Sequence, residues 1–281
     1  MATRFVSFVT PEETPSFGLM TEQGVWDLRK RGAGETLADF IERGLGAGAA
    51  ILDDQPDHAC DAIRLLPVIP DPKRIICVGL NYHDHVAEME RPDSDKPTIF
   101  LRLPSSQVSH GQSIIHPPET SRLDYEGELA VIIGKGGRRI ARDQALGHVA
   151  GYACYNDVTA RDWQRHSTQW APGKNFPATG AFGPWMIPAA DLPERSRCSL
   201  VTRLNGEEVQ RALLTQMIFS IEDLIEYVSI FTPLDAGDVI VSGTPGGVGD
   251  RRDPPRYLRE GDEVSVEITG IGTLRNRVAK E

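Results

Sequence analysis

Basic residues are in deficit in this sequence. Its 30 Lys and Arg are outnumbered by 40 Asp and Glu, which leaves a formal net charge of -10. Surfaces that bind nucleic acids or anionic membranes are rich in Lys and Arg. The deficit therefore argues against a nucleic acid or a membrane surface as the partner.

Long apolar runs are missing as well. No stretch approaches the ~18 consecutive apolar residues that a transmembrane helix needs. The first residues, Met1 to Arg4, lead directly into a strand-like segment and not into the apolar core of a signal peptide. We therefore expect a cytoplasmic protein.

Cysteine is scarce. Cys60, Cys77, Cys154 and Cys198 lie far apart, and no pair has the Cys-x-x-Cys spacing of zinc or redox sites. Three of them stand in apolar or strand-like segments. This pattern predicts reduced, buried thiols and gives no reason to expect a zinc site.

Three common catalytic motifs are absent. The chain has no Gly-Lys-Ser/Thr phosphate loop, no Gly-x-Gly-x-x-Gly after a strand and no Gly-x-Ser-x-Gly elbow. These absences argue against a P-loop nucleotide enzyme, a dinucleotide-binding fold and an ordinary serine hydrolase. The glycine-rich segment 242–249 has two interpretations: its backbone N–H groups and the Thr244 hydroxyl face a substrate oxygen, or it is only a tight turn.

The length of 281 residues suits one sizeable domain with a smaller unit. Residues 66–72 are rich in proline, which is typical of a stiff linker. We therefore place a boundary near residue 70. It separates a small N-terminal α+β domain, residues 1–70, from a catalytic domain, residues 71–281.

Short apolar segments predict many strands. They lie at residues 5–9, 17–28, 74–80, 98–101, 129–133, 149–155, 199–210, 238–242 and 263–268. Helical spacing and capping boxes predict helices at 37–45 and after Ser220, and residues 170–177 are expected to form an extended loop. Many strands with few helices favour an α+β fold built on a folded-over mixed sheet, and argue against a parallel α/β sheet.

An acidic cluster at residues 124–128 precedes the apolar run Leu129–Ile133. Strand side chains alternate between the two faces, so Glu126 and Glu128 must share one face. The next predicted strand ends at Asp157, which brings a third carboxylate within reach. Buried like charges need a cation, and carboxylate oxygens suit Mg²⁺ or Mn²⁺. The alternative is a solvated edge strand without a metal.

Two further stretches could carry chemistry. His83, His85 and Glu88 follow a predicted buried strand, and a carboxylate can orient a histidine as a general base. The same histidines could instead bind zinc or iron, or simply lie in solvent. Lys174, in the segment Gly-Lys-Asn-Phe, could polarise a substrate carbonyl, pair with a carboxylate or be solvated.

Taken in chain order, these stretches resemble one family. They are Gly79–Glu88, Asp124–Leu129, Asn156–Asp162, Gly173–Phe176, Met217–Ile221 and Ser242–Gly249. Over residues 71–281 the sequence resembles the fumarylacetoacetate hydrolase family. The resemblance implies a mixed β-roll, usually dimeric, with a small N-terminal domain, so we expect a homodimer.

The resemblance also implies roles for single residues. It assigns Mg²⁺ or Mn²⁺ to Glu126, Glu128 and Asp157, and assigns His85 and Glu88 to a dyad that activates water from a closing loop. It places Lys174 and Thr244 around the substrate oxygens. Further candidates for substrate binding are Tyr82, Gly243 and Arg102. For Arg102, His166, Gln169, Arg251 and Arg252, contact with a distal substrate carboxylate competes with exposure to solvent, which we favour for each.

The activity that the resemblance implies is hydrolysis of a carbon–carbon bond in an acylpyruvate, such as fumarylpyruvate or maleylpyruvate, during breakdown of aromatic compounds. The metal would hold the keto-acid end while His85 deprotonates a water. The family also includes decarboxylases and isomerases of oxaloacetate or hydroxymuconate-type diacids, and hydrolases of diketo sugar acids. Because the scaffold does not choose among them, these remain alternatives. A catalytically silent binding protein is disfavoured, since no ligand or dyad residue is missing.

Overall fold

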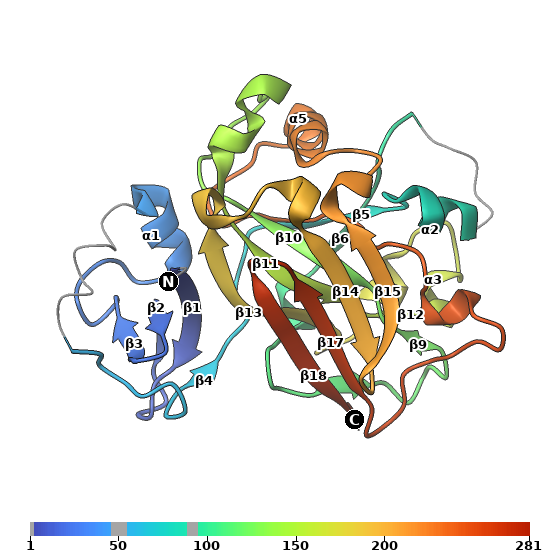
Figure 1. The fold of residues 1–281 in the computed structure, drawn as a ribbon, viewed down its shortest axis with the longest axis horizontal. Coiled ribbons are helices and arrows are strands. Elements are labelled where there is room, and N and C mark those ends of the chain that lie inside the picture. The colour runs from blue at the N-terminus through green and yellow to red at the C-terminus, as the bar shows by residue number, and fades with distance from the viewer. Residues whose placement is uncertain (1–2, 46–54, 89–94) are drawn as a thin grey trace.

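The computed structural model describes residues 3–45, 55–88 and 95–281, and strands dominate it (Figure 1). The strands are β1 (Arg4–Val9), β2 (Pro15–Thr21), β3 (Gly24–Asp27), β4 (Arg64–Leu65), β5 (Ile75–Gly79), β6 (Thr98–Arg102), β7 (Gln107–Ser109), β8 (Ile114–His116), β9 (Leu123–Asp124), β10 (Gly127–Ile133), β11 (Val149–Asp157), β12 (Thr159–Ala160), β13 (Gly180–Pro188), β14 (Ser199–Leu204), β15 (Glu207–Leu213), β16 (Val239–Val241), β17 (Glu263–Ile268) and β18 (Gly272–Lys280).

The helices are short apart from one. They are α1 (Leu37–Arg43), α2 (His83–Glu88), α3 (Arg161–Gln164), α4 (Ala171–Lys174) and α5 (Ile221–Phe231), with 3₁₀ turns η2 (Pro104–Ser106), η3 (Arg142–His148), η4 (Ala189–Asp191), η5 (Arg195–Arg197), η6 (Leu214–Gln216) and η7 (Gly249–Arg251). The predicted α+β fold, rich in strands and poor in helices, is confirmed.

The largest sheet of the molecule is mixed. Its strand order is β3-β2-β1-β13-β11-β10-β16-β5-β6. Most neighbours are antiparallel, but β16 runs parallel to β5. A five-stranded sheet, β15-β14-β17-β18-β8, lies in front of β10 and β11 in Figure 1.

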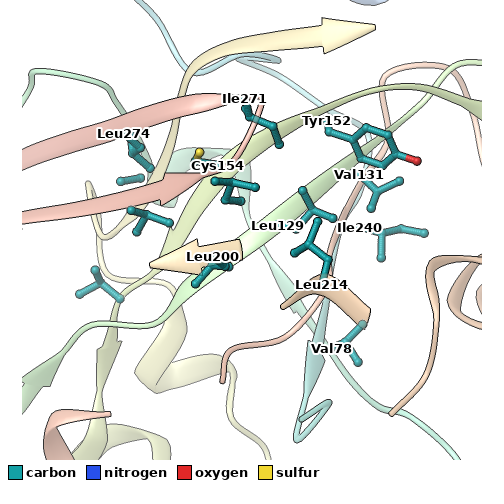
Figure 2. Packing of buried hydrophobic residues seen from close by; sticks show 14 of the residues in the cluster. Val78, Leu129, Val131, Tyr152, Cys154, Leu200, Leu214, Ile240, Ile271 and Leu274 are labelled. Atoms are coloured by element: carbon teal, nitrogen blue, oxygen red, sulfur yellow. The ribbon is translucent and has the colours of Figure 1, made fainter. Parts of the chain in front are cut away.

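The central strand β10 supplies side chains to two cores. Leu129 and Val131 face the five-stranded sheet, where they pack with Cys154 of β11 and Leu200 of β14 (Figure 2). Ala130 belongs to the cluster on the opposite face. The alternation is the one that a strand buried on both faces requires.

Several local predictions hold. Helix α1 begins after Thr36 with the expected capping box and ends at Arg43, because Gly44 leaves the helix with a φ of 93°. The Asn205–Gly206 turn has φ values of 53° and 83°, as a type I′ hairpin demands. The segment 170–177 was expected to be an extended loop, which is wrong: residues 171–174 form α4. Its Pro172 occupies an early position, where a helix tolerates proline.

The N-terminal residues share the large sheet with the rest of the chain. Strand β1 pairs with β13 at Phe5 and Met186. Phe17 and Phe40 lie in the same core cluster as Ile132 of β10. The domain boundary near residue 70 stays a prediction.

Cys77, Cys154 and Cys198 are buried, Cys60 is half-buried, and all four are free thiols, as predicted. Among the described helices, none has the length and apolar character needed to cross a membrane. The homodimer and the cytoplasmic location stay predictions.

Candidate active site

Three carboxylates meet at the ends of β10 and β11. Gly127 pairs with Asn156, and the Asp157 backbone N–H donates to the Glu126 carbonyl at 2.8 Å. This register directs Glu126, Glu128 and Asp157 to a single site, where their oxygens lie within 4.8 Å of one another. All three residues are buried. The expected convergence is therefore confirmed, and a solvated edge strand is excluded.

Lys174 lies inside this cluster. Its Nζ is 2.6 Å from Glu126 Oε2 and 2.6 Å from Asp157 Oδ2. It also lies 4.8 Å from the ring centre of Phe100. Burial opposes the Lys174 charge, but attraction to Asp157 and Glu126 outweighs burial and raises the pKa of the amine. Of the roles considered for Lys174, the structure shows the one in which the amine pairs with carboxylates.

Arg161 makes a second set of ion pairs. Its Nε donates to Asp124 Oδ2 at 2.8 Å, and its Nη2 lies 2.6 Å from Glu126 Oε1. Burial opposes the charge of Glu126, but the positive charges of Arg161 and Lys174 outweigh burial and lower the pKa of this carboxyl. Glu126 is therefore held as a carboxylate.

Glu128 is the least compensated member of the cluster. Burial, followed by repulsion from Asp157 and Glu126, raises its pKa well above the usual range. A buried group of oxygen donors with surplus negative charge has the chemistry that binds a hard divalent cation. Glu126, Glu128 and Asp157 thus fit Mg²⁺ or Mn²⁺.

Arg102 is buried, so the expectation that it lies in solvent is wrong. Its Nη1 donates to Asp157 Oδ1 at 2.5 Å and to the Val158 carbonyl at 3.1 Å. Its Nη2 donates to Thr179 Oγ1 at 2.7 Å, and its Nε to Ser106 Oγ at 3.2 Å. Arg102 therefore orients Asp157 from behind the cluster.

The glycine-rich segment 242–249 uses its backbone N–H groups on the protein's own carboxylates. Gly243 donates to Glu128 Oε2 at 2.5 Å, and Gly247 donates to both oxygens of Glu88 at 3.1 and 3.2 Å. Gly243 has a φ of 99°, and a Cβ there would lie 2.7 Å from the Cβ of Asn81. Of the two interpretations offered by the sequence, neither anticipated this arrangement.

Thr244 and Tyr82 differ in their surroundings. The Thr244 hydroxyl donates to the Gly127 carbonyl at 3.0 Å and accepts from Gln210 Nε2 at 2.8 Å. The Tyr82 hydroxyl is buried and has no hydrogen-bond partner among the described residues. Burial, and then the nearby Glu128, raise the pKa of Tyr82. Thr244 faces the cavity described next.

His85 and Glu88 lie on α2, as the dyad requires. His85 Nδ1 is 3.4 Å from Glu88 Oε2, and the imidazole is buried. The polar, proline-bearing segment 89–97 has a sequence that suits a mobile lid, and its residues 89–94 lie outside the described residues. The structure thus brings His85 and Glu88 together, as their spacing on one helical turn suggests.

A cavity of about 750 Å³ joins these groups. The buried part of its lining includes His85, Glu126, Glu128, Arg161, Lys174 and Thr244. The lining also has an apolar set, which includes Ile99, Phe100, Leu101, Trp170 and Phe231. It has in addition a polar set, the polar wall, which consists of Gln164, Arg165, Ser167, Thr168 and Gln169. The cavity can therefore hold a small acid at the buried carboxylates and contact its far end with the remaining lining residues.

The other sequence candidates differ in their surroundings. Arg252 is half-buried and donates to Tyr125 Oη at 3.0 Å and to the Val209 carbonyl at 2.8 Å. His166 is exposed, with its ring centre 4.7 Å from that of Trp163. Gln169 is exposed and lines the cavity. Solvent exposure is thus confirmed for His166 and Gln169 and wrong for Arg252.

Comparison with known proteins decides the family. The model described as "Fumarylacetoacetate (FAA) hydrolase C-terminal" matches residues 74–279. The chain belongs to the fumarylacetoacetate hydrolase family of enzymes. The family resemblance drawn from the motifs is confirmed.

Two curated relatives are both named as oxaloacetate tautomerases. Oxaloacetate tautomerase YisK of Bacillus subtilis (strain 168) is 43% identical over 225 residues, which cover 79% of this chain and 75% of that protein. The human mitochondrial oxaloacetate tautomerase FAHD2A is 37% identical over 286 residues, with coverage of 98% and 91%. The second match extends over both predicted domains.

Solved structures agree on the fold. Fumarylacetoacetate hydrolase EaFAH from Exiguobacterium antarcticum has a TM-score of 0.88 and 36% identity, with 100% of both chains covered. The 5-carboxymethyl-2-hydroxymuconate delta-isomerase from Mycobacterium smegmatis has a TM-score of 0.78 and 28% identity, with 99% of both chains covered. Proteins named for different activities thus share this fold.

Proposed function

We propose that this protein is a metal-dependent isomerase that interconverts the keto and enol forms of a 2-keto diacid such as oxaloacetate. The observation that carries the proposal is that His85, backed by Glu88, faces the same cavity as the carboxylate cluster. The tautomerase activity named for both relatives supports this alternative better than the acylpyruvate hydrolysis expected first.

Glu126, Glu128 and Asp157 would hold the metal. When bound, Mg²⁺ or Mn²⁺ supplies a Lewis acid for the oxygens of a 2-keto acid, which makes the neighbouring C3 protons more acidic. Arg161 and Lys174 keep Glu126 ionised, and Arg102 orients Asp157. These contacts hold the ligands in place before substrate arrives.

His85 would move the proton. Its Nδ1 faces Glu88, which leaves Nε2 to take a proton from C3 and return it to the enol oxygen. Glu88 orients the imidazole and is itself held by the Gly247 N–H. Burial of the imidazole limits exchange of that proton with bulk water.

Acylpyruvate hydrolysis is the second candidate. The cavity volume of about 750 Å³ favours it, because this volume suits ligands larger than a four-carbon acid. In that reaction His85 would take a proton from a water that attacks the distal carbonyl. Both reactions use the same base.

Product analysis separates the two. The purified protein, supplied with Mg²⁺ or Mn²⁺, is mixed with oxaloacetate and separately with acylpyruvates, while enol absorbance, pyruvate and carbon dioxide are followed. We expect faster equilibration of the oxaloacetate enol, with no pyruvate from acylpyruvates. Cleavage of an acylpyruvate, with oxaloacetate equilibrating at the rate of the metal-only blank, would overturn the isomerase proposal.

A further inference from the structure

We infer that Arg165 binds the distal carboxylate of the substrate, so that the protein selects 2-keto acids that carry a second carboxylate. The inference rests on the proposed function, because it assumes that the keto-acid end of the substrate lies at the carboxylate cluster. Arg165 was not among the residues that the sequence singled out, although His166 beside it was.

The positive charges in the cavity are not equally available. Among the described residues that line it, the permanently charged cations are Arg161, Arg165 and Lys174. Lys174 is buried between Glu126 and Asp157, and Arg161 is buried between Glu126 and Asp124. Moving either one to a substrate would leave a buried carboxylate without its partner, which is costly.

Arg165 is in a different position. Its side chain is 43% exposed and forms an ion pair with Asp250. The pair uses two guanidinium N–H groups, with Nη1 donating to Asp250 Oδ1 at 3.2 Å and Nη2 to Oδ2. An arginine has five N–H donors, and the part of the chain that the structure describes gives the others no partner. Those N–H groups are free to donate to a carboxylate in the cavity.

The Asp250 carboxylate fixes Arg165 in place. It is 5% exposed and accepts a hydrogen bond from Tyr257 Oη at 2.8 Å. The Asp250 backbone N–H donates to Asp124 Oδ2 at 3.0 Å, which ties it to the residue that pairs with Arg161. A guanidinium held in this way binds a carboxylate with a smaller loss of side-chain entropy than a free surface arginine.

A short helix connects Arg165 to the carboxylate cluster. Arg165 directly follows α3, whose Arg161 contacts Glu126 and also donates to Gln164 Oε1 at 3.1 Å. The apolar residues of the cavity lining offer nothing to a charged group. A substrate with a charged far end is therefore accepted along the polar wall, and one with a neutral far end gains nothing from Arg165.

The test compares oxaloacetate with its 4-methyl ester, which keeps the 2-keto acid and removes the distal charge. In Arg165→Gln we expect KM for oxaloacetate to rise about tenfold or more, as for loss of a charge-assisted contact, and KM for the ester to change less than about twofold. Arg165→Lys keeps the charge but loses the planar arrangement of N–H groups, so its KM for oxaloacetate should be intermediate. Arg142→Gln, which removes an exposed arginine paired with Asp223 away from the cavity lining, is the control.

A binding measurement makes the test independent of turnover. With Mg²⁺ present, calorimetry compares malate with 2-hydroxybutyrate, in which a methyl group replaces the distal carboxylate. Wild type should prefer malate, and Arg165→Gln should lose that preference. If wild type accelerates neither tautomerisation, the proposed function fails, while the binding preference still decides the role of Arg165.

Equal changes for the acid and the ester, or an unchanged preference for malate in Arg165→Gln, would overturn the inference. The substitution also leaves Asp250 without its partner, which could disturb the fold. Arg165→Gln/Asp250→Asn removes both charges, and this double variant should unfold at the temperature of wild type while retaining the loss of malate preference.

Discussion

The backbone N–H of Gly243 donates a hydrogen bond to Glu128 Oε2 at 2.5 Å. Four residues later the Gly247 N–H binds Glu88, the partner of His85. One loop therefore fixes both a candidate metal ligand and the candidate base. Exchange of a side chain cannot remove a backbone donor, so the loop holds the two groups through its backbone. A side chain at Gly243 or Gly247 would strain this link, because both residues have a φ of 99°.

His85→Gln should lower kcat for the tautomerisation by about 10²- to 10⁴-fold, because it removes the general base. Metal affinity should stay near that of wild type, since His85 is not among the three carboxylates. The measurement is steady-state kinetics together with calorimetric Mn²⁺ titration. His148→Gln is the control, as His148 contacts the Lys135 carbonyl and does not line the cavity. An unchanged kcat would remove His85 from the mechanism.

Two substitutions at Glu88 separate the effect of its contact with His85 from that of its contact with Gly247. Glu88→Gln can still accept from the Gly247 N–H but loses the charge that orients His85, whereas Glu88→Ala loses both. We expect kcat to fall in both variants, with the larger loss in Glu88→Ala. The measurement is kcat at saturating oxaloacetate in steady-state kinetics. Asp84→Asn, on the same helix, is the control.

Lys174→Met should reveal whether a cation binds the cluster. Loss of the amine leaves Glu126 and Asp157 without their shared partner, and breaking a buried pair in this way costs about 3–5 kcal/mol of unfolding free energy. Added Mg²⁺ should offset part of this loss. The rise in Tm on adding Mg²⁺ should therefore be larger in Lys174→Met than in wild type. Lys280→Met, at an exposed lysine, should behave like wild type. The same Mg²⁺ response in all three proteins would contradict a metal at this cluster.

The carboxylate cluster could be predicted from the sequence because it depends on local patterns along two successive strands. Period two places Glu126 and Glu128 on one face, and the end of the next strand brings Asp157 beside them. The partners of these carboxylates were not predictable in the same way. Arg102 reaches Asp157 from 55 positions away, and no local pattern distinguishes it from an exposed strand arginine. Only the assembled sheet shows which charges meet.

The same limit applies to the glycine-rich loop and to Arg165. The spacing of the glycines indicated free backbone donors, but which acceptors reach them depends on how the loop packs. Arg165 follows a helix of only four residues. Its neighbour Asp250 is 85 positions away, so their pairing is a property of the tertiary structure.

Gly79 should not tolerate alanine. A Cβ at Gly79 would lie 2.3 Å from the Trp170 ring, which packs on Phe100 in the apolar set of the cavity lining. Gly79→Ala must displace the indole and should destabilise the protein by about 1–3 kcal/mol. Tryptophan fluorescence and urea unfolding measure the displacement and its cost. Trp170→Ala removes the clash, so the double variant should be more stable than the sum of the single effects. Additive effects would contradict the contact.

Acid should weaken the contribution of Asp57 to stability. Burial of Asp57 is outweighed by hydrogen bonds from Lys30, Arg31 and the Asp27 backbone, so the pKa of its carboxyl is lowered in the folded protein. A lowered pKa stabilises the fold fully above the unfolded value of about 3.9, and the contribution disappears as pH falls through the folded pKa. The stability difference between wild type and Asp57→Asn in urea should thus be constant from pH 7 to about 5 and shrink below about 4. A difference that grows on acidification would show that Asp57 is not held by these cations.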